Sequence, residues 1–421
     1  MKRYYSYILF FLYLFSFVLA GSKTDSVSVV AMNLLQEGKY SESISVFSTL
    51  SIDSLSSKAS LLCGQACLAL NDFQSAIKYF SHAVQLQPFH SGYRFQLAKA
   101  YYQNGNVATS QKEYEKILAI DSTYSPALFQ LGLLNIELKN YEQAAVCFTA
   151  VTQLNPRDFL AYYHLGSSYI FAGNNTDSAI VFLTSSMSLN SEYIPTVRLL
   201  ASVYFFKKRY DDALRLYEKL QVLQPTNAEY CYRSGLCCAV EGNFSLAIVT
   251  FKEAIVRDST EADYFSQLAT AYFNQKQFDS AAYAYKKASL LDNDNAQTFY
   301  NLGLTYVKLD SLEEAMQVFK KAIQLYRPDN IAKVFVQMGN AQYLNNNYAV
   351  ASELYKKALE YSDFEFNAQF FLAASYEQMN NKKKAIQEYK RFIKMFAEDT
   401  LLRGKTKEAI DRLQQLKKNL H

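Results

Sequence analysis

The chain has 421 residues, of which 43 are Lys or Arg and 39 are Asp or Glu, giving a formal net charge of +4. A charge this close to balance supplies no overall electrostatic drive toward nucleic acid. We therefore predict no nucleic-acid partner.

The first twenty residues have the pattern of a secretory signal peptide. Lys2 and Arg3 supply the positive end, residues 4–18 form an apolar stretch, and Val18-Leu19-Ala20 offers a small-residue cleavage site. Loss of Lys2 and Arg3 would take the formal charge from +4 to +2. We assign residues 1–20 to a signal peptide and expect an exported protein, located in the periplasm or elsewhere in a bacterial cell envelope.

A retained membrane anchor is the alternative for this segment, because its apolar stretch is almost long enough to span a bilayer. In that case an uncleaved signal segment would be the protein's membrane contact. The run Leu19-Ala20-Gly21-Ser22 resembles a lipoprotein processing site. Ser22 stands where the lipidated cysteine would be, so we do not expect a lipid anchor.

Beyond the signal segment, a small residue recurs about every 34 residues, eleven times in all. The series is Ala31, Gly64, Ala98, Gly132, Gly166, Ala201, Gly235, Ala269, Gly303, Gly339 and Ala373. A second small residue follows each of these, and a bulky residue comes four positions later, as in Ala144 with Phe148 and Ala247 with Phe251. Apolar residues three and four apart within each unit indicate amphipathic helices. A fixed period of this kind predicts stacked helical hairpins.

These repeats resemble the tetratricopeptide repeat. The runs Tyr162-Tyr163-His164-Leu165-Gly166 and Phe299-Tyr300-Asn301-Leu302-Gly303 look like its first helix, and Tyr141-Glu142-Gln143-Ala144 with Phe148 looks like its second. The resemblance covers nearly the whole mature chain. It implies an all-α, right-handed superhelical solenoid of about eleven helical hairpins over residues 24–397. Fold alone does not fix function.

A capping helix is expected over residues 398–421. Leu402, Ile410, Leu413 and Leu416 would cover the last repeat. The basic side chains would face water, as a terminal repeat requires; these are Lys405, Lys407, Arg412, Lys417 and Lys418.

The sequence gives no support for a metal site, a cofactor or an enzyme. It has no Gly-x-x-x-x-Gly-Lys loop, no Gly-x-Ser-x-Gly turn and no His-Glu-x-x-His motif. The six cysteines include no Cys-x-x-Cys pair, and the four histidines are scattered. Export raises the possibility of disulfides. The repeat register instead places Cys63, Cys67, Cys231 and Cys238 at buried apolar positions, which favours small hydrophobes over bridges.

Functional side chains are expected along the concave groove that the resemblance implies. Carried over position by position, the fifth residue of the first helix is often aromatic, and the sixth often carries an amide or another hydrogen-bonding group. Amides both donate and accept hydrogen bonds, so they could hold an extended peptide backbone. The alternative is that these polar residues only keep the groove hydrated. The predicted partner-binding residues are Phe95, Gln96, Phe129, Gln130, Tyr163, His164, Phe171, Arg198, Phe205, Phe206, Tyr232, Arg233, Gln267, Tyr300 and Asn301.

The middle of this groove is unusually apolar, and an exposed apolar stripe usually marks a binding site. Its residues are Leu133, Ile136, Ile170, Phe171, Phe205, Phe206, Leu236 and Val240. The alternative is that some of them pack between helices. We predict a non-catalytic scaffold that binds a protein or peptide. The competing hypothesis is a glycan-binding solenoid that stacks sugars on the groove tyrosines.

Overall fold

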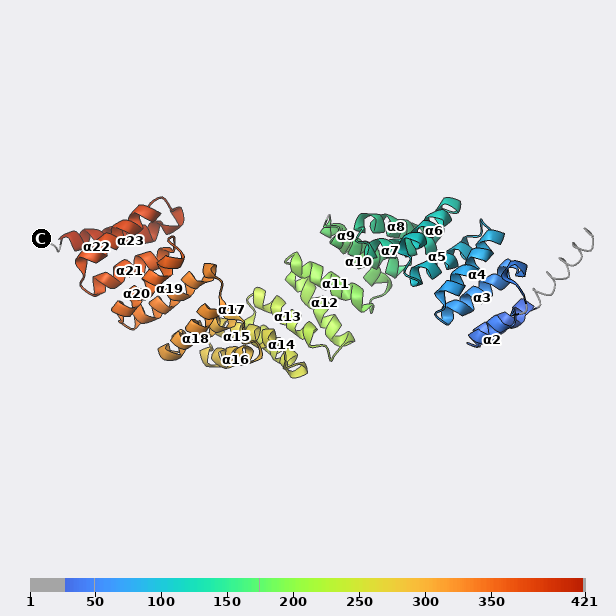
Figure 1. Ribbon diagram of the computed structural model, residues 1–421. Coiled ribbons are helices and arrows are strands. Elements are labelled where there is room, and N and C mark those ends of the chain that lie inside the picture. The colour runs from blue at the N-terminus through green and yellow to red at the C-terminus, as the bar shows by residue number, and fades with distance from the viewer. Residues whose placement is uncertain (1–26, 49, 174, 419–421) are drawn as a thin grey trace, which may run out of the picture. The chain divides into compact units, whose positions relative to one another are not determined.

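The computed structural model describes residues 27–48, 50–173 and 175–418, which form helices joined in pairs (Figure 1). The predicted signal peptide lies outside the described residues. Within the described ranges there is no strand, nor any helix both long and apolar enough to cross a membrane. The paired helices and the final helix confirm the all-α solenoid expected from the repeats.

Each hairpin consists of a first helix and a second helix. The first helices are α3 (Ser57–Ala69), α5 (Ser91–Gln103), α7 (Ser125–Glu137), α9 (Phe159–Phe171), α11 (Ile194–Phe206), α13 (Ala228–Val240), α15 (Ala262–Asn274), α17 (Ala296–Lys308), α19 (Pro328–Leu344) and α21 (Phe366–Gln378). The second helices are α4 (Phe73–Leu86), α6 (Val107–Ile120), α8 (Tyr141–Leu154), α10 (Thr176–Leu189), α12 (Tyr210–Leu223), α14 (Phe244–Arg257), α16 (Phe278–Leu291), α18 (Leu312–Leu325), α20 (Tyr348–Tyr361) and α22 (Lys382–Phe396).

Shorter elements precede and follow these pairs. Helical residues 27–36 and α2 (Tyr40–Ser45) come first, followed by the 3₁₀ turn η1 (Ile52–Ser54). The turn η2 (Thr400–Leu402) and helix α23 (Arg403–Lys418) come last. The chain divides into two compact units, one ending at Val203 and the other beginning at Tyr204. We call them the N-terminal unit and the C-terminal unit and describe each by itself.

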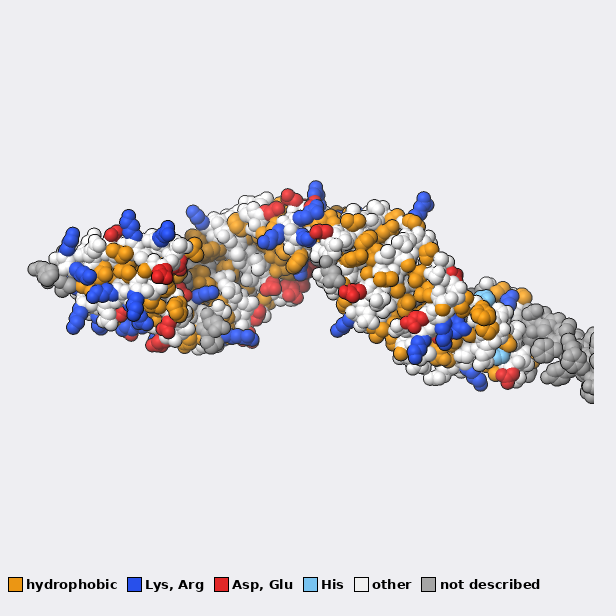
Figure 2. Space-filling model, turned by 90° about the horizontal axis from the view of Figure 1, so that it is seen from above, with side chains coloured by type: hydrophobic (Ala, Val, Ile, Leu, Met, Phe, Trp, Pro, Cys, Tyr) orange, Lys and Arg blue, Asp and Glu red, His pale blue; other side chains and the backbone are white. Residues whose placement is uncertain are grey.

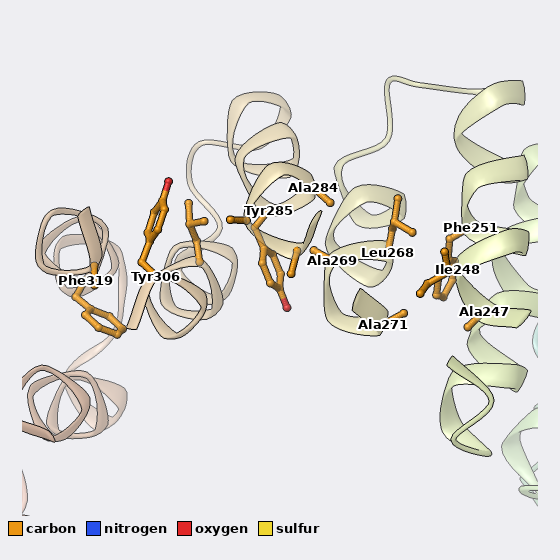
Figure 3. Packing of buried hydrophobic residues seen from close by; sticks show 14 of the residues in the cluster. Ala247, Ile248, Phe251, Leu268, Ala269, Ala271, Ala284, Tyr285, Tyr306 and Phe319 are labelled. Atoms are coloured by element: carbon orange, nitrogen blue, oxygen red, sulfur yellow. The ribbon is translucent and has the colours of Figure 1, made fainter. Parts of the chain in front are cut away.

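The small residue of each repeat lets an aromatic ring of the second helix lie directly on the first helix. A Cβ on Gly235 would lie 2.5 Å from Cε1 of Phe251, and a Cβ on Gly303 would lie 2.5 Å from Cε1 of Phe319. Both phenylalanines are fully buried. Figure 3 shows Phe251, Tyr285 and Phe319 packed in this way along the C-terminal unit. The repeating glycine and aromatic pair therefore sets how closely the two helices of a hairpin approach.

A residue with positive φ reverses the chain inside most hairpins. Gly105 and Gly242 take this conformation at φ +81° and +80°, as expected for glycine. In the corresponding turns of other repeats a lysine does so, with φ 61° at both Lys139 and Lys276. Asn140, the residue after Lys139, directly precedes α8.

Helix α23 caps the C-terminal unit, with one change from the predicted register. Leu413 and Leu416 are buried as expected, and Ala409 occupies the buried position that the sequence assigned to Ile410, which is exposed. Lys405 and Arg412 do not simply face water. The Nζ of Lys405 lies 4.2 Å from the centre of the Phe370 ring, and Arg412 forms ion pairs with Glu377 and Glu408. Lys and Arg side chains gather at this end of the chain in Figure 2.

All six cysteines are buried free thiols. Burial raises the pKa of Cys63 and of Cys237 to about 12. This confirms the prediction that these side chains act as small hydrophobic residues.

Candidate partner-binding site

First helices of neighbouring hairpins contact one another within each unit. In the N-terminal unit α7 contacts α9, and in the C-terminal unit the contacts run in succession from α13 through α15, α17 and α19 to α21. Second helices instead pack against the first helices on either side of them. We call the solvent-facing side of the first helices the inner face and that of the second helices the outer face.

The aromatic residues at the fifth position of the first helices are half-buried on the inner face. Each packs against the bulky residue of its own second helix. Phe129 lies 5.4 Å from Phe148, Tyr232 lies 5.9 Å from Phe251, and Tyr300 lies 6.1 Å from Phe319, between ring centres. Phe95 packs in the same way on Tyr114. These residues hold the hairpin together and leave only part of each ring for a partner.

Tyr163 is half-buried in the N-terminal unit but packs on different neighbours. Its ring packs edge-on against His164 and Tyr193, with ring centres 5.0 and 5.4 Å away. Burial raises the pKa of its hydroxyl above the usual value. Burial likewise raises the pKa of Tyr232 and of Tyr300. All three hydroxyls therefore remain protonated at neutral pH and can both donate and accept hydrogen bonds.

The sixth position supplies polar groups, which are also half-buried. Gln96 and Gln130 lie on the N-terminal unit, and Gln267 lies on the C-terminal unit. The Asn301 side-chain oxygen accepts a hydrogen bond of 2.8 Å from Nε2 of Gln297. Arg233 donates to Glu229 at 2.6 Å and forms an ion pair with it. A bound peptide that hydrogen-bonds to Asn301 or Arg233 must therefore compete with the bonds from Gln297 and to Glu229.

His164 is an aromatic packing residue more than a polar one. Its ring stacks on Phe148 with centres 5.1 Å apart and meets Phe129 edge-on at 5.7 Å. Burial lowers the pKa of His164 to about 4. The imidazole is therefore neutral at physiological pH, with one nitrogen that donates and one that accepts a hydrogen bond.

Exposed apolar side chains lie at the C-terminal ends of several first helices. On the N-terminal unit Phe171 is exposed, and its ring stacks on Tyr141 with centres 5.4 Å apart. On the C-terminal unit Phe206 is 79% exposed and Val240 is also exposed. Phe205 is half-buried and packs edge-on against Tyr210 at 5.3 Å. Arg198 is exposed on α11 in the N-terminal unit.

The rest of the predicted apolar stripe packs between helices. Leu133 and Ile136 contact the cluster around Phe148 and Leu165, and Leu236 contacts the cluster around Phe251. All three are half-buried, as is Ile170. For Leu133, Ile136 and Leu236 the alternative of packing between helices therefore applies.

Sequence reasoning missed one exposed residue of this kind. Leu344, at the C-terminal end of α19, is exposed on the C-terminal unit. Helix α19 has 17 residues, whereas the other first helices have 13. The extra residues precede Gly339, so Leu344 lies five positions after the small residue of its repeat, as Phe206 lies five after Ala201. This shared register is the signal that would have found the residue.

No group of three or more His, Cys, Asp or Glu side chains suited to a metal ion occurs within the described ranges. The side chains brought together on the inner face are aromatic, apolar and amide groups. Such groups bind by contact and hydrogen bonding.

Comparison with known families places most of the chain in repeat models. Models described as "Tetratricopeptide repeat" match residues 31–91, 198–262 and 336–400, and also 91–124, 125–158 and 296–329. A model described as "TPR repeat" matches residues 269–310. The protein belongs to the tetratricopeptide repeat family. Repeats of this family are typically non-catalytic, which agrees with the prediction that the protein is not an enzyme.

Several solved structures are similar to the chain. One is a crystal structure of MamA, with 26% identity over 39% of this chain and 95% of that chain, at a TM-score of 0.37. Another is yeast Tom70, with 15% identity over 95% of this chain and 96% of that chain, at a TM-score of 0.38. A third is YrrB, whose structure is entitled a TPR protein with an unusual peptide-binding site. It has 23% identity over 44% of this chain and 94% of that chain, at a TM-score of 0.39. A comparison with curated proteins found no match. None of these TM-scores is high enough for the likeness to bear on function.

Proposed function

We propose that the protein is a non-catalytic scaffold that binds a protein or peptide on the inner face of its first helices. The observation that carries this proposal is Phe206, a large aromatic side chain that is 79% exposed. Leaving apolar area in water costs about 25 cal/mol per Å². A large exposed aromatic side chain with other exposed apolar groups is typical of an interaction site, and Val240, at the matching position of the next first helix, is also exposed.

A peptide fits this face better than a glycan. Sugar stacking needs an open ring face, whereas Tyr163 packs against His164 and Tyr193, and Tyr232 packs against Phe251 and Tyr264. Amide side chains remain half-exposed nearby, at Gln96 and Gln130 on one unit and Gln267 on the other. Amides match the alternating donors and acceptors of an extended backbone.

We place this function in the cell envelope, following the signal-peptide pattern of residues 1–20. Intact-mass measurement of protein from its native host tests the location. A mature chain beginning near Gly21 or Ser22 supports export with cleavage. A full-length mass in the soluble cell fraction would contradict it.

Affinity capture from native cell extract tests the binding function, with bound chains identified by mass spectrometry. Phe206→Ala should weaken the capture of a peptide or protein at least tenfold, because central aromatic side chains carry much of the energy of an interface. Phe364→Ala is the matched control, since Phe364 is 76% exposed but lies in the loop between α20 and α21. Equal capture by both variants, or polysaccharide in the eluate, would refute the proposal.

A further inference from the structure

The outer face of the C-terminal unit carries an apolar row that the inner-face function does not use. Val222 on α12, Val256 on α14 and Leu290 on α16 occupy the same repeat position and are 78%, 87% and 77% exposed. At this position α18 has Gln324 and α20 has Glu360. The row is therefore confined to three successive second helices.

A second exposed apolar position lies seven residues earlier on two of these helices. Val249 on α14 and Tyr283 on α16 are both exposed. Residues seven apart lie on one face of a helix. Helices α14 and α16 thus each present two apolar side chains to solvent on the same face.

A hollow of about 620 Å³ lies between these two helices. Ile255 and Val256 line it from α14, Phe265 and Leu268 from α15, and Tyr283 from α16. Its lining is mainly apolar, and its volume suits one bulky aliphatic or aromatic side chain. Val256 and Tyr283 are both exposed apolar residues and part of this lining, so the hollow adjoins the exposed apolar side chains of α14 and α16.

Cations border this surface. Lys252, Lys286 and Lys287 are exposed and lie between the two apolar positions of their helices. The Nζ of Lys252 lies 5.5 Å from the Tyr272 ring centre, and the Nζ of Lys287 lies 5.7 Å from that of Tyr283. Both rings line the hollow.

Three acidic side chains bear on the charge of this border. Glu253 forms an ion pair with Arg257 at 3.3 Å, Asp279 lines the hollow itself, and Glu314 interacts electrostatically with Lys286. Because Glu253 is already paired, three lysines against Asp279 and Glu314 leave the border with a net positive charge. Such a border favours a partner that carries carboxylates beside its apolar side chains.

The N-terminal unit contains a natural contrast. A hollow of about 480 Å³ borders α8 and α9, and its lining includes Thr149 and Gln153. These residues occupy the repeat positions that Lys252 and Val256 hold in the C-terminal unit. The hollow alone is therefore a feature of the repeat. Lysines also stand at the position of Lys252 in α18 and α20, as Lys320 and Lys356, so it is the combination of these lysines with two exposed apolar positions that distinguishes α14 and α16.

We propose that the outer face of α14 and α16 is a second docking surface, which binds an acidic amphipathic peptide segment of a partner protein. A bulky apolar side chain of that segment enters the hollow between the two helices. Its flanking carboxylates lie beside Lys252, Lys286 and Lys287. This surface is independent of the proposed inner-face function.

Two designed fluorescent peptides test the proposal by fluorescence anisotropy. Both have about four helical turns and the same leucine face, and their polar positions are all Glu in one and all Lys in the other. The Glu peptide should bind the full-length protein at least tenfold more tightly than the Lys peptide. Val256→Ser with Leu290→Ser should weaken the Glu peptide at least tenfold, without unfolding, because both side chains are exposed. Lys252→Glu with Lys286→Glu and Lys287→Glu should reverse the preference between the peptides.

Controls separate this surface from the inner face and from self-association. Phe206→Ala and Val181→Ser, an exposed residue on α10 of the other unit, should leave Glu-peptide binding unchanged. Equal binding of the two peptides, or full binding by the double serine variant, would overturn the proposal. So would a wild-type dimer in sedimentation velocity that is lost in the double serine variant, because the occupant would then be a second copy of the chain.

Discussion

Replacing Gly303 with alanine should destabilise the C-terminal unit, although alanine is the better helix former. A Cβ at this position would lie 2.5 Å from Cε1 and 2.6 Å from Cδ1 of Phe319. Carbon atoms without a bond between them pack best at about 3.5–4.0 Å, so the buried ring must move by about 1 Å. Overpacking of this kind typically costs about 1–3 kcal/mol.

The gain in helix propensity from glycine to alanine is about 1 kcal/mol. We therefore expect Gly303→Ala to lower the free energy of local unfolding by up to about 2 kcal/mol, which is the overpacking cost less the gain in helix propensity. Native-state hydrogen exchange should report the loss mainly in α17, α18 and the hairpins beside them, because stability in a repeat array is nearly local.

Gly404→Ala is the matched control. Gly404 lies near the start of α23, and nothing comes within 4 Å of a Cβ placed there. This substitution should be neutral or stabilise the protein by up to about 1 kcal/mol. If Gly303→Ala stabilised the protein as Gly404→Ala does, the ring of Phe319 could not be packed against the glycine, and the packing of the repeating pair would be refuted.

Three further predictions concern turns, thiols and pH. Lys139→Gly and Lys276→Gly should each stabilise the protein by about 1 kcal/mol in chemical denaturation, because glycine relieves the positive φ at these exposed turn residues; a loss of stability would contradict this. Cys63 and Cys237 should react with maleimide at pH 8 only as fast as the protein opens, since burial raises the pKa of each to about 12; rapid labelling of native protein would be the contrary result. Burial lowers the pKa of His164 to about 4 from a usual 6.5. Between these two pH values the unfolded chain binds a proton that the folded protein does not. The free energy of unfolding therefore falls as the pH drops from 6.5 to 4, by at most about 1.4 kcal/mol per pH unit. His164→Phe should remove this part of the pH dependence of unfolding, and an unchanged profile would refute it.

The sequence predicted the hairpins well because their packing rule is local. Spacing alone predicts that a small residue such as Gly235 pairs with an aromatic residue such as Phe251. In the structure the ring of Phe251 lies on Gly235. In some repeats a serine takes the place of the alanine in the second helix. It still packs against the first helix, because its hydroxyl donates a hydrogen bond to that helix. Ser110 is buried, and its Oγ donates to the Ala98 carbonyl oxygen at 2.8 Å.

The proposed binding face was harder to predict, because the exposure of a first-helix residue depends on how it packs on neighbouring helices. The predicted apolar stripe combined several repeat positions: Phe206, five residues after Ala201, is exposed, whereas Leu236, one residue after Gly235, is half-buried. Only the structure shows which of these positions faces solvent. In the capping helix the sequence predicted that Ile410 is buried, but the buried residue is its neighbour Ala409. Neighbouring residues differ by only about 100° around the helix axis, so a rotation of the helix by that angle decides which of the two is buried.

The outer-face row could have been read from the sequence, since Val222, Val256 and Leu290 are each 34 residues apart. Amphipathic patterning assigns such residues to a buried face by default. Only their exposure in the structure marks them as candidates for binding.

Hydrogen exchange on the protein with its captured partner bound is the most direct test of binding to the inner face. We expect a protein or peptide partner, with new protection from exchange on first helices of the inner face, including the C-terminal end of α11 near Phe206. Protection confined to second helices, or a bound polysaccharide in place of a peptide, would contradict it.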